Sequence, residues 1–444
     1  MAAVEDQPVR LAKAILRIGA MATIGWTMLT AACVLLAAAL LPGYAAPVVA
    51  ALLLAFAAVP LWRFHRITPP ASATVPLEGA GQSELNLIVR QISSALGVPT
   101  PAAIELSPDC DAWLEPRIGG PVLVIGTPFL WWLRVSELRG LLAPVIAGLE
   151  AAHDPAVVRA RRLVRRLDVA ERRGCAPWPR RAVAVVAESC RGKAEGMERV
   201  IAAQASQRAR IVEPAGRVYA HEQVGLVAAG WDRLLTRLAD PAWAAGYAPN
   251  ALNAALVSAL VELGERDRVG VGLADRLSER PACDLLDEPG AVDRAVSAVV
   301  PVVYQGKAVD RPLDWDDYTR LVAEPILRKA AHAAPDHPLV AKTRALLLSP
   351  AHLGLGGEST PGPAAGPSAN AESGDGELPA GLRAVLQCGL VDLGCAAFDV
   401  DWLDGVVLRD RAGLTVPVDE IVHALVDSAD FAPLRDWLSY AARL

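Results

Sequence analysis

The stretch that decides the architecture of this 444-residue chain is IGAMATIGWTMLTAACVLLAAALLPGYAAPVVAALLLAFAAVPLW, residues 18–62. It contains no Asp, Glu, Lys, Arg or His, although 21% of the whole chain is charged. Leu41-Pro42-Gly43-Tyr44 divides it into 18–41 and 45–62, and about 20 apolar residues allow a helix to cross a bilayer. The stretch therefore predicts a transmembrane helical hairpin, and the remainder has the composition of a water-soluble body.

Basic residues flank this hairpin on both sides. Arg10, Lys13 and Arg17 precede it, Arg63 and Arg66 follow it, and the connecting loop carries no charge. The positive-inside rule then places both ends in the cytoplasm. With an Arg-rich, Ala-rich composition typical of GC-rich bacteria, we expect a multi-pass protein of a bacterial inner membrane, with most of the chain cytoplasmic. A helical hairpin buried in a soluble protein is the alternative.

The seven cysteines show no CxxC spacing, which argues against a disulfide framework and agrees with a reducing compartment. The net charge of −6 argues against nucleic acid as a partner. The expected partners are instead the lipid bilayer and an unidentified protein or peptide.

Patterns in the remainder predict its organisation. Periodic apolar residues predict a helix over 83–96, and a further helix begins near Ser136, a candidate N-cap. Short β-like runs separated by turn residues lie at 103–106, 112–114 and 121–126. We predict five parts: an N-terminus 1–17, a hairpin 18–66, a body 67–348, a flexible linker 349–378 and a small C-terminal domain 379–444.

Nine arginines are concentrated between 159 and 181. They are Arg159, Arg161, Arg162, Arg165, Arg166, Arg172, Arg173, Arg180 and Arg181. One interpretation is the solvated face of a helix. The other is contact with anionic lipid, because the body is tethered at the membrane.

The order of these elements resembles that of the membrane-anchored metallopeptidases of the M48 family (HtpX-like). The resemblance covers about residues 10–348. The segments that carry it are DAW at 111–113, VIGTPFL at 124–130, SELRGLLAPVIAG at 136–148 and DHPLVAKTRALL at 336–347. It implies an α+β, mainly α architecture, in which a zincin-like (M48 peptidase-like) domain follows the hairpin and a small C-terminal domain ends the chain.

The sequence departs from this family where the chemistry takes place. In HExxH, two histidines on one helix face hold Zn²⁺ and the Glu activates water. The corresponding residues here are Pro144, Val145 and Gly148, which offer no ligand and no base. A proline in a helix interior costs about 3 kcal/mol, so we also expect the helix to be kinked or broken there.

The third ligand implied by the resemblance falls on His221 or on Glu222, and both registers remain open. His153 and Asp154 are weaker candidates for a relocated metal site, and the alternative for them is a helix terminus.

We therefore expect no cofactor and no catalytic residue, and a peptide-binding or protein-binding or regulatory role for a catalytically inactive homologue at the membrane face. The alternative is an active zinc metalloendopeptidase with substituted ligands, acting in membrane-protein quality control.

Overall fold

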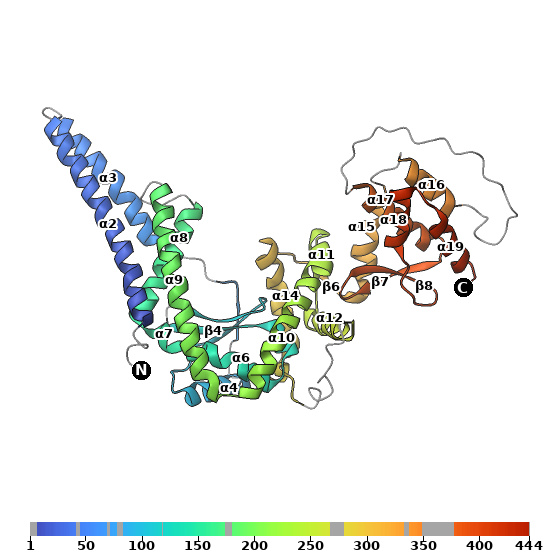
Figure 1. The fold of residues 1–444 in the computed structure, drawn as a ribbon, viewed down its shortest axis with the longest axis horizontal. Helices are drawn as coiled ribbons and strands as arrows, with labels where there is room; N and C mark the ends of the chain where they lie inside the picture. Colours follow the sequence, from blue (N-terminus) through green and yellow to red (C-terminus); the bar gives the residue numbers. More distant parts are fainter. Residues whose placement is uncertain are drawn as a thin grey trace. The chain divides into compact units, whose positions relative to one another are not determined.

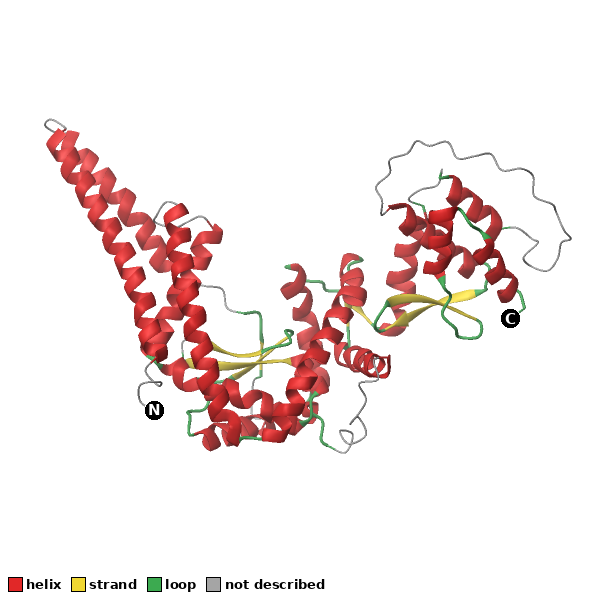
Figure 2. Ribbon diagram, viewed as in Figure 1, coloured by secondary structure: helices red, strands yellow, loops and turns green. Residues whose placement is uncertain are grey.

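The computed structural model describes residues 7–40, 45–68, 72–77, 83–117, 119–173, 180–266, 279–332, 337–348 and 377–443. The described chain is mainly helical with small sheets, as predicted (Figures 1 and 2). It forms two compact units. The first comprises Met1–Gly225 and Asp275–Pro289, and the second Leu226–Ala274 and Gly290–Leu444. The zincin-like assignment of the body remains a prediction.

The first unit begins with the predicted apolar hairpin, α2 (Gln7–Leu40) and α3 (Ala45–Arg66). By length and hydropathy, α2 is long and apolar enough to cross a membrane. α2 begins at Gln7, well before residue 18, and its first turns pack on the body. The use of α3 as a second span remains a prediction.

Two long helices, α8 (Pro155–Arg173) and α9 (Arg180–Arg208), pack beside the N-terminal half of α2 (Figure 1). Their shared core includes Ala12 and Ile15 of α2, each fully buried, and Phe64 at the end of α3. Partly buried residues of α2 as far along as Trp26 pack against it. The start of the predicted span at 18 therefore lies inside a protein core, and only the later part of α2 projects from it.

A four-stranded sheet lies beside this bundle in the order β1-β2-β4-β3. Its strands are β1 (Val75–Pro76), β2 (Ile104–Ser107), β3 (Ala112–Arg117) and β4 (Gly120–Gly126). β2 and β4 are parallel, whereas β3 and β4 are antiparallel. The three predicted strands are confirmed. β4 is central and buried along most of its length, which leaves β3 at an edge of the sheet.

Short helices complete the first unit. They are α4 (Ser83–Leu96), α5 (Thr127–Trp132), α6 (Val135–Ala147), α7 (Leu149–His153), η1 (Ala209–Ile211), η3 (Ala282–Leu285) and the first part of α10 (Pro214–Leu234). The helix predicted over 83–96 is confirmed. Ser136 as the N-cap of α6 is wrong: the N-cap is Arg134, whose backbone N–H donates to the Glu137 carboxylate at 2.8 Å.

Two glycines allow α6 to cross the start of α10 closely. A Cβ on Gly140 would lie 2.5 Å from the backbone nitrogen of Arg217. A Cβ on Gly216 would lie 2.4 Å from the carbonyl oxygen of Ser136. Both contacts are with backbone, which cannot rotate away, so this crossing requires glycine on both sides.

The second unit contains the remaining elements. They are η2 (Leu235–Ala239), α11 (Asp240–Ala244), β5 (Ala248–Pro249), α12 (Leu252–Arg266), α14 (Pro289–Gln305), β6 (Pro312–Leu313), η4 (Trp315–Asp317), η5 (Thr319–Ala323), α15 (Glu324–Ala331), α16 (Pro338–Leu347), α17 (Glu377–Asp392), β7 (Ala396–Asp401), β8 (Gly405–Asp410), α18 (Val418–Ser428) and α19 (Ala432–Ala441). β5 pairs with β6 and β7 pairs with β8.

The end of the chain packs differently from the predicted ranges. α15 and α16, which the sequence places in the body ending at 348, share one hydrophobic core with α17, α18 and α19. Val340 and Leu347 are buried in it beside Leu386. The predicted linker 349–378 lies almost entirely outside the described residues, and the five predicted ranges remain predictions.

A buried carboxylate in the second unit caps a helix from outside it. Asp293 of α14 is 3% exposed, and its Oδ1 accepts a hydrogen bond from the backbone N–H of Asn253 at the start of α12. Burial raises the pKa of Asp293 to about 6. The hydrogen bond from Asn253 acts in the opposite direction and lowers this pKa, but its effect is smaller. The charged form is therefore disfavoured in the folded state.

This pKa predicts a pH-dependent loss of stability. Below pH 3.8 the Asp293 carboxyl is protonated in both the folded and the unfolded state, so it does not lower the free energy of unfolding. As the pH rises from 3.8 to 6, the unfolded chain ionises first, so the folded state loses ~3 kcal/mol. Asp293→Asn keeps the acceptor oxygen. We expect it to match the parent near pH 4 and to be more stable at pH 7 in urea unfolding. A difference that does not vary with pH contradicts this.

The glycine crossing gives a second prediction. Gly140→Ala and Gly216→Ala should each destabilise the first unit by about 1–3 kcal/mol, because backbone must move to admit the methyl group. Gly225→Ala, on the same helix α10 with nothing within 4 Å of its Cβ, is the matched control. It should stabilise by up to about 1 kcal/mol through helix propensity. Thermal unfolding of the full chain in detergent measures all three, and equal effects would refute the crossing.

Candidate functional site

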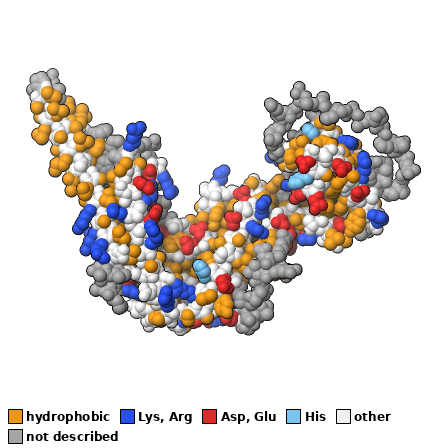
Figure 3. All heavy atoms as spheres, in the orientation of Figure 1, with side chains coloured by type: hydrophobic (Ala, Val, Ile, Leu, Met, Phe, Trp, Pro, Cys, Tyr) orange, Lys and Arg blue, Asp and Glu red, His pale blue; other side chains and the backbone are white. Residues whose placement is uncertain are grey.

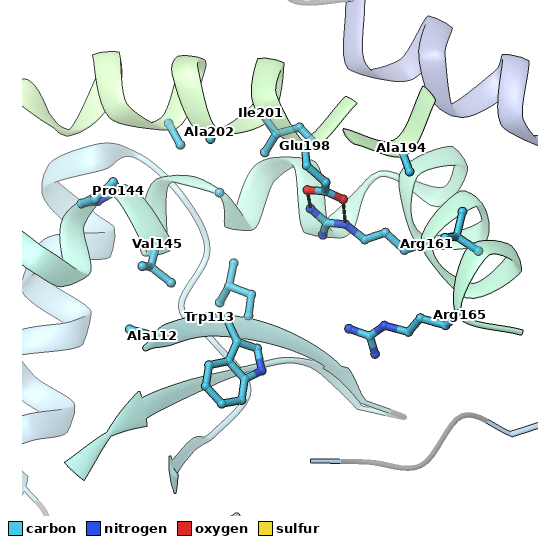
Figure 4. Close-up of a pocket in the computed structure, with 14 residues that line it drawn as sticks. Ala112, Trp113, Pro144, Val145, Arg161, Arg165, Ala194, Glu198, Ile201 and Ala202 are labelled. Atoms are coloured by element: carbon cyan, nitrogen blue, oxygen red, sulfur yellow. Dashed lines mark hydrogen bonds and ion pairs between the residues drawn. The ribbon is translucent and has the colours of Figure 1, made fainter. Parts of the chain in front are cut away.

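The candidate site is a groove of about 610 Å³ in the first unit, between the edge strand β3 and the helices α6, α8 and α9 (Figure 4). Its lining residues are Ala112, Trp113, Leu114, Pro144, Val145, Gly148, Arg161, Val164, Arg165, Ala194, Glu198, Ile201, Ala202 and Ala205. All but three are apolar or glycine. The groove is therefore suited to apolar side chains, with its charge confined to the side formed by α8 and α9.

That charged wall contains one matched pair and one further arginine. Arg161 donates from Nε and Nη2 to the two carboxylate oxygens of Glu198, each at 2.7 Å. Arg165, one turn further along α8, extends towards β3 (Figure 4). Within the described part of the chain, no carboxylate lies within ion-pair distance of Arg165. The groove therefore carries one guanidinium charge that Glu198 does not balance.

Pro144, Val145 and Gly148, the three positions that the resemblance aligned with HExxH, all line this groove. Pro144 and Val145 come from the last turn of α6, and Gly148 separates α6 from α7. The expectation of a broken helix is confirmed, although the break lies at Gly148, one turn after Pro144. A Cβ on Gly148 would lie 3.8 Å from Leu114 of β3, so the helix ends directly over the edge strand.

His221 and Glu222 lie elsewhere. Both are exposed on α10, and neither lines the groove. The structure therefore does not bring either candidate third ligand to Pro144, Val145 and Gly148. The choice between His221 and Glu222 as the third ligand therefore does not affect this groove.

The weaker candidates, His153 and Asp154, form a helix junction. The ring nitrogen Nδ1 of His153 lies 2.7 Å from the carbonyl oxygen of Leu149. The Oδ1 of Asp154 accepts from the backbone nitrogens of Ala156 and Val157 at 2.7 and 3.1 Å, and so caps α8. At this point the chain turns by 96°. The helix-terminus interpretation accounts for both residues.

Among the described residues, no three His, Cys, Asp or Glu side chains are grouped closely enough to hold a metal ion. The donor set on the groove walls also does not suit zinc, because its one carboxylate, Glu198, is held by Arg161. A cysteine nucleophile near β3 is disfavoured too. Burial, with Asp109 and Asp111 alongside, raises the pKa of Cys110 to about 12, which keeps the thiol protonated at neutral pH.

Sequence reasoning missed the wall that α9 contributes. Ala194, Glu198 and Ala202 recur every four residues and so share one helix face. This spacing was visible in the sequence. The residues of β3 and α6 that face this wall could not be inferred, because they precede Ala194 by more than forty positions in the chain.

This geometry predicts the outcome of a metal analysis. The full chain, loaded with zinc at neutral pH and washed, should hold far less than one zinc per chain. His221→Ala should leave that value unchanged, and so should the control His423→Ala, an exposed histidine of the second unit. Stoichiometric zinc together with peptidase activity, both lost in His221→Ala only, would establish the active metalloendopeptidase instead.

Comparison with protein-family models, with curated proteins and with solved structures finds no match for this chain.

Proposed function

We propose that this chain is a membrane-attached, M48 metallopeptidase-like protein that binds an extended peptide segment and does not cleave it. The observation that carries the proposal is the groove in which Pro144, Val145 and Gly148 face the edge strand β3. In a peptidase of this layout, the same place would hold the metal and the scissile bond. Here it retains an apolar cavity and an open strand edge.

The edge of β3 supplies a means of recognition. Pro116 pairs with Pro121, and neither has a backbone N–H, so this pair is of the type without hydrogen bonds. Because the two types alternate along an antiparallel ladder, Ala112 and Leu114 also point their N–H and C=O groups away from β4. The Ala112 N–H donates to Oδ1 of Asp111 at 2.7 Å, so Leu114 offers the N–H and both residues offer a carbonyl oxygen. These two residues line the groove. An extended peptide can therefore add to β3 as a further strand.

The side chains around the groove suggest the chemistry of such a peptide. Trp113, Leu114 and Val145 offer apolar contacts, and Arg165 offers a positive charge. A peptide that alternates apolar and polar residues would place alternate side chains on the same face. An acidic residue among them would neutralise Arg165 in a partly apolar setting, where charge pairs gain strength.

The lack of chemistry at the three positions supports binding without cleavage. A general base alone contributes about 10²–10⁴-fold to a rate, and bound zinc polarises the carbonyl and lowers the pKa of its water. A pyrrolidine, an isopropyl group and a glycine can do neither. The proposed role is therefore that of a binding or regulatory module.

The proposed location is the cytoplasmic face of a bacterial inner membrane. It is supported by α2, which is long and apolar enough to span, and by the basic residues that flank the hairpin. As part of the proposal, α3 returns the chain to the side from which α2 came.

Fluorescence anisotropy tests peptide binding with the full chain in detergent. The probe is a fluorescein-labelled decapeptide of alternating Val and Thr with one central Glu. Ala202→Trp, which fills the groove from α9, should weaken binding at least tenfold. Ala203→Trp, the adjacent exposed residue that does not line the groove, is the matched control and should leave binding unchanged. Equal binding by both variants would exclude the groove.

The same probe tests the strand geometry. Two versions of the peptide carry N-methyl groups on alternate amides, one on the odd-numbered and the other on the even-numbered residues. Only alternate N–H groups face β3, so one version should lose binding and the other should keep it. Loss of binding in both versions, or in neither, would contradict strand addition.

A third arm tests the charge preference. Peptides with central Glu, Gln or Lys should bind in that order. Arg165→Ala should remove the preference, whereas Arg162→Ala, exposed on the same helix but not lining the groove, should retain it. An order that survives Arg165→Ala would place the recognition of charge elsewhere.

A further inference from the structure

One close contact and one ordinary van der Waals contact show how α8 and α9 lie along α2. A Cβ on Gly19 of α2 would lie 2.6 Å from the side chain of Leu163 on α8. A Cβ on Gly196 of α9 would lie 3.9 Å from the side chain of Leu11 on α2. α8 runs in the same direction as α2, and α9 returns in the opposite direction (Figure 1). These contacts place every residue of α8 and α9 at a level along the hairpin.

The C-terminal end of α8 and the N-terminal end of α9 reach the same level along α2. Arg172 is nine residues beyond Leu163, about 13 Å along its helix, which corresponds to Met28 of α2. Arg181 is fifteen residues before Gly196, about 22 Å along α9, which corresponds to Trp26. Two independent registers therefore agree within one helical turn. We call this end of α8 and α9 the arginine end.

The arginine end carries an excess of positive charge. Its acidic side chains Asp168, Glu171 and Glu188 all pair with one residue, Arg191, at 3.1 Å for Asp168 and 3.0 Å for Glu188. Arg172 and Arg181 are exposed, and no carboxylate of the described residues pairs with them. Arg191 balances only one of these three negative charges, but residues 165–191 contain seven arginines against three acids, so the net charge of this end is +4. Arg172 and Arg181 are two exposed guanidinium groups that can meet an external anion.

At this same level the hairpin becomes an exposed apolar surface. Beyond it, large side chains of both helices are more than half exposed, and the projecting end in Figure 3 shows hydrophobic spheres without charged ones. Those side chains are Met28, Leu29, Leu35, Leu36, Leu40, Val48, Leu52 and Leu54. A bilayer that covers this surface must begin its hydrocarbon region beside the arginine end, because charged side chains are costly within it.

We propose that the arginine end, through Arg172 and Arg181, docks on anionic lipid headgroups of the bilayer that the hairpin enters. The proposal rests on the membrane attachment proposed above and is independent of the peptide groove. Juxtamembrane arginines are attracted by the negative surface potential of an anionic membrane. The docking would also hold α8 and α9, and with them two walls of the groove, next to the membrane surface.

The docking has a consequence for the hairpin. Residues 27–40 of α2, which extend beyond the arginine end, are 14 residues long, or about 21 Å. The hydrocarbon core is about 30 Å thick. The part of the hairpin beyond the arginine end is therefore shorter than the hydrocarbon core of an average bilayer. A docked hairpin should favour thin bilayers, because hydrophobic mismatch is unfavourable.

Depth-dependent quenching tests the docking with the full chain in vesicles of phosphatidylcholine with 0 or 30% phosphatidylglycerol. The fluorophore NBD is placed on the one cysteine of two variants in which every other cysteine is replaced by Ala. The labelled position is Cys33 of α2 in the first variant and Ala184→Cys, beside Arg181, in the second. Spin labels in the lipid headgroup or deep in the acyl chain act as quenchers. We expect deep quenching at Cys33 in both lipids. Headgroup quenching at position 184 should rise at least twofold with phosphatidylglycerol and fall in 0.5 M salt.

Charge reversal supplies the matched comparison. Arg172→Glu with Arg181→Glu should abolish the rise at position 184. Arg159→Glu with Arg199→Glu, the same change at exposed residues of the opposite ends of α8 and α9, should preserve it. Deep quenching at Cys33 with no phosphatidylglycerol-dependent rise at 184 would overturn the docking alone. No quenching at Cys33 would overturn the membrane attachment itself.

Acyl-chain length tests the consequence separately. Quenching at position 184 by the headgroup label should be stronger in bilayers of 14-carbon chains than in bilayers of 22-carbon chains. The same or weaker quenching in the thin bilayer would contradict docking at the level of Met28.

Discussion

The structure of the first unit depends on a core that α2 shares with α8 and α9. An apolar helix that emerged freely from the body would leave the groove without a fixed relation to the hairpin. Instead, Ala12 and Ile15 are fully buried against these two helices. α8 and α9 then provide Arg161 and Glu198 to the groove on another face. One pair of helices therefore links the apolar hairpin to the candidate site.

The second constraint is the chemistry that the groove lacks. A helix end over an edge strand is a suitable place for a metal-bound water and an extended substrate. The side chains of Pro144 and Val145 and the glycine at position 148 supply no metal ligand and no general base at that helix end. The shape of the groove and the backbone groups of β3 are features that can hold a peptide strand. The proposal of binding without cleavage rests on this difference.

The parts of the fold that the sequence predicted are those set by local patterns. The helix at 83–96 and the three short strands were predicted because their apolar periods are local properties. The N-cap at Ser136 was wrong because Glu137 reaches back to the backbone of Arg134 instead. The sharing of residues 18–26 with α8 and α9 was not predictable, since an apolar residue suits lipid and protein core equally. Likewise, the faces of α15 and α16 do not reveal that they pack on α17.

The candidate site was half predictable for the same reason. The sequence located Pro144, Val145 and Gly148 through a resemblance, and DAW at 111–113 marked the strand opposite. The Arg161–Glu198 pair joins two helices across 37 positions of the chain, so no local pattern could reveal it. The most direct test of the central claim is amide hydrogen exchange of β3 in the full chain, with and without the Glu-containing decapeptide. We predict that the peptide protects the amide of Leu114, and that the peptide is recovered intact. Unchanged exchange at Leu114, or a cleaved peptide, would contradict the account.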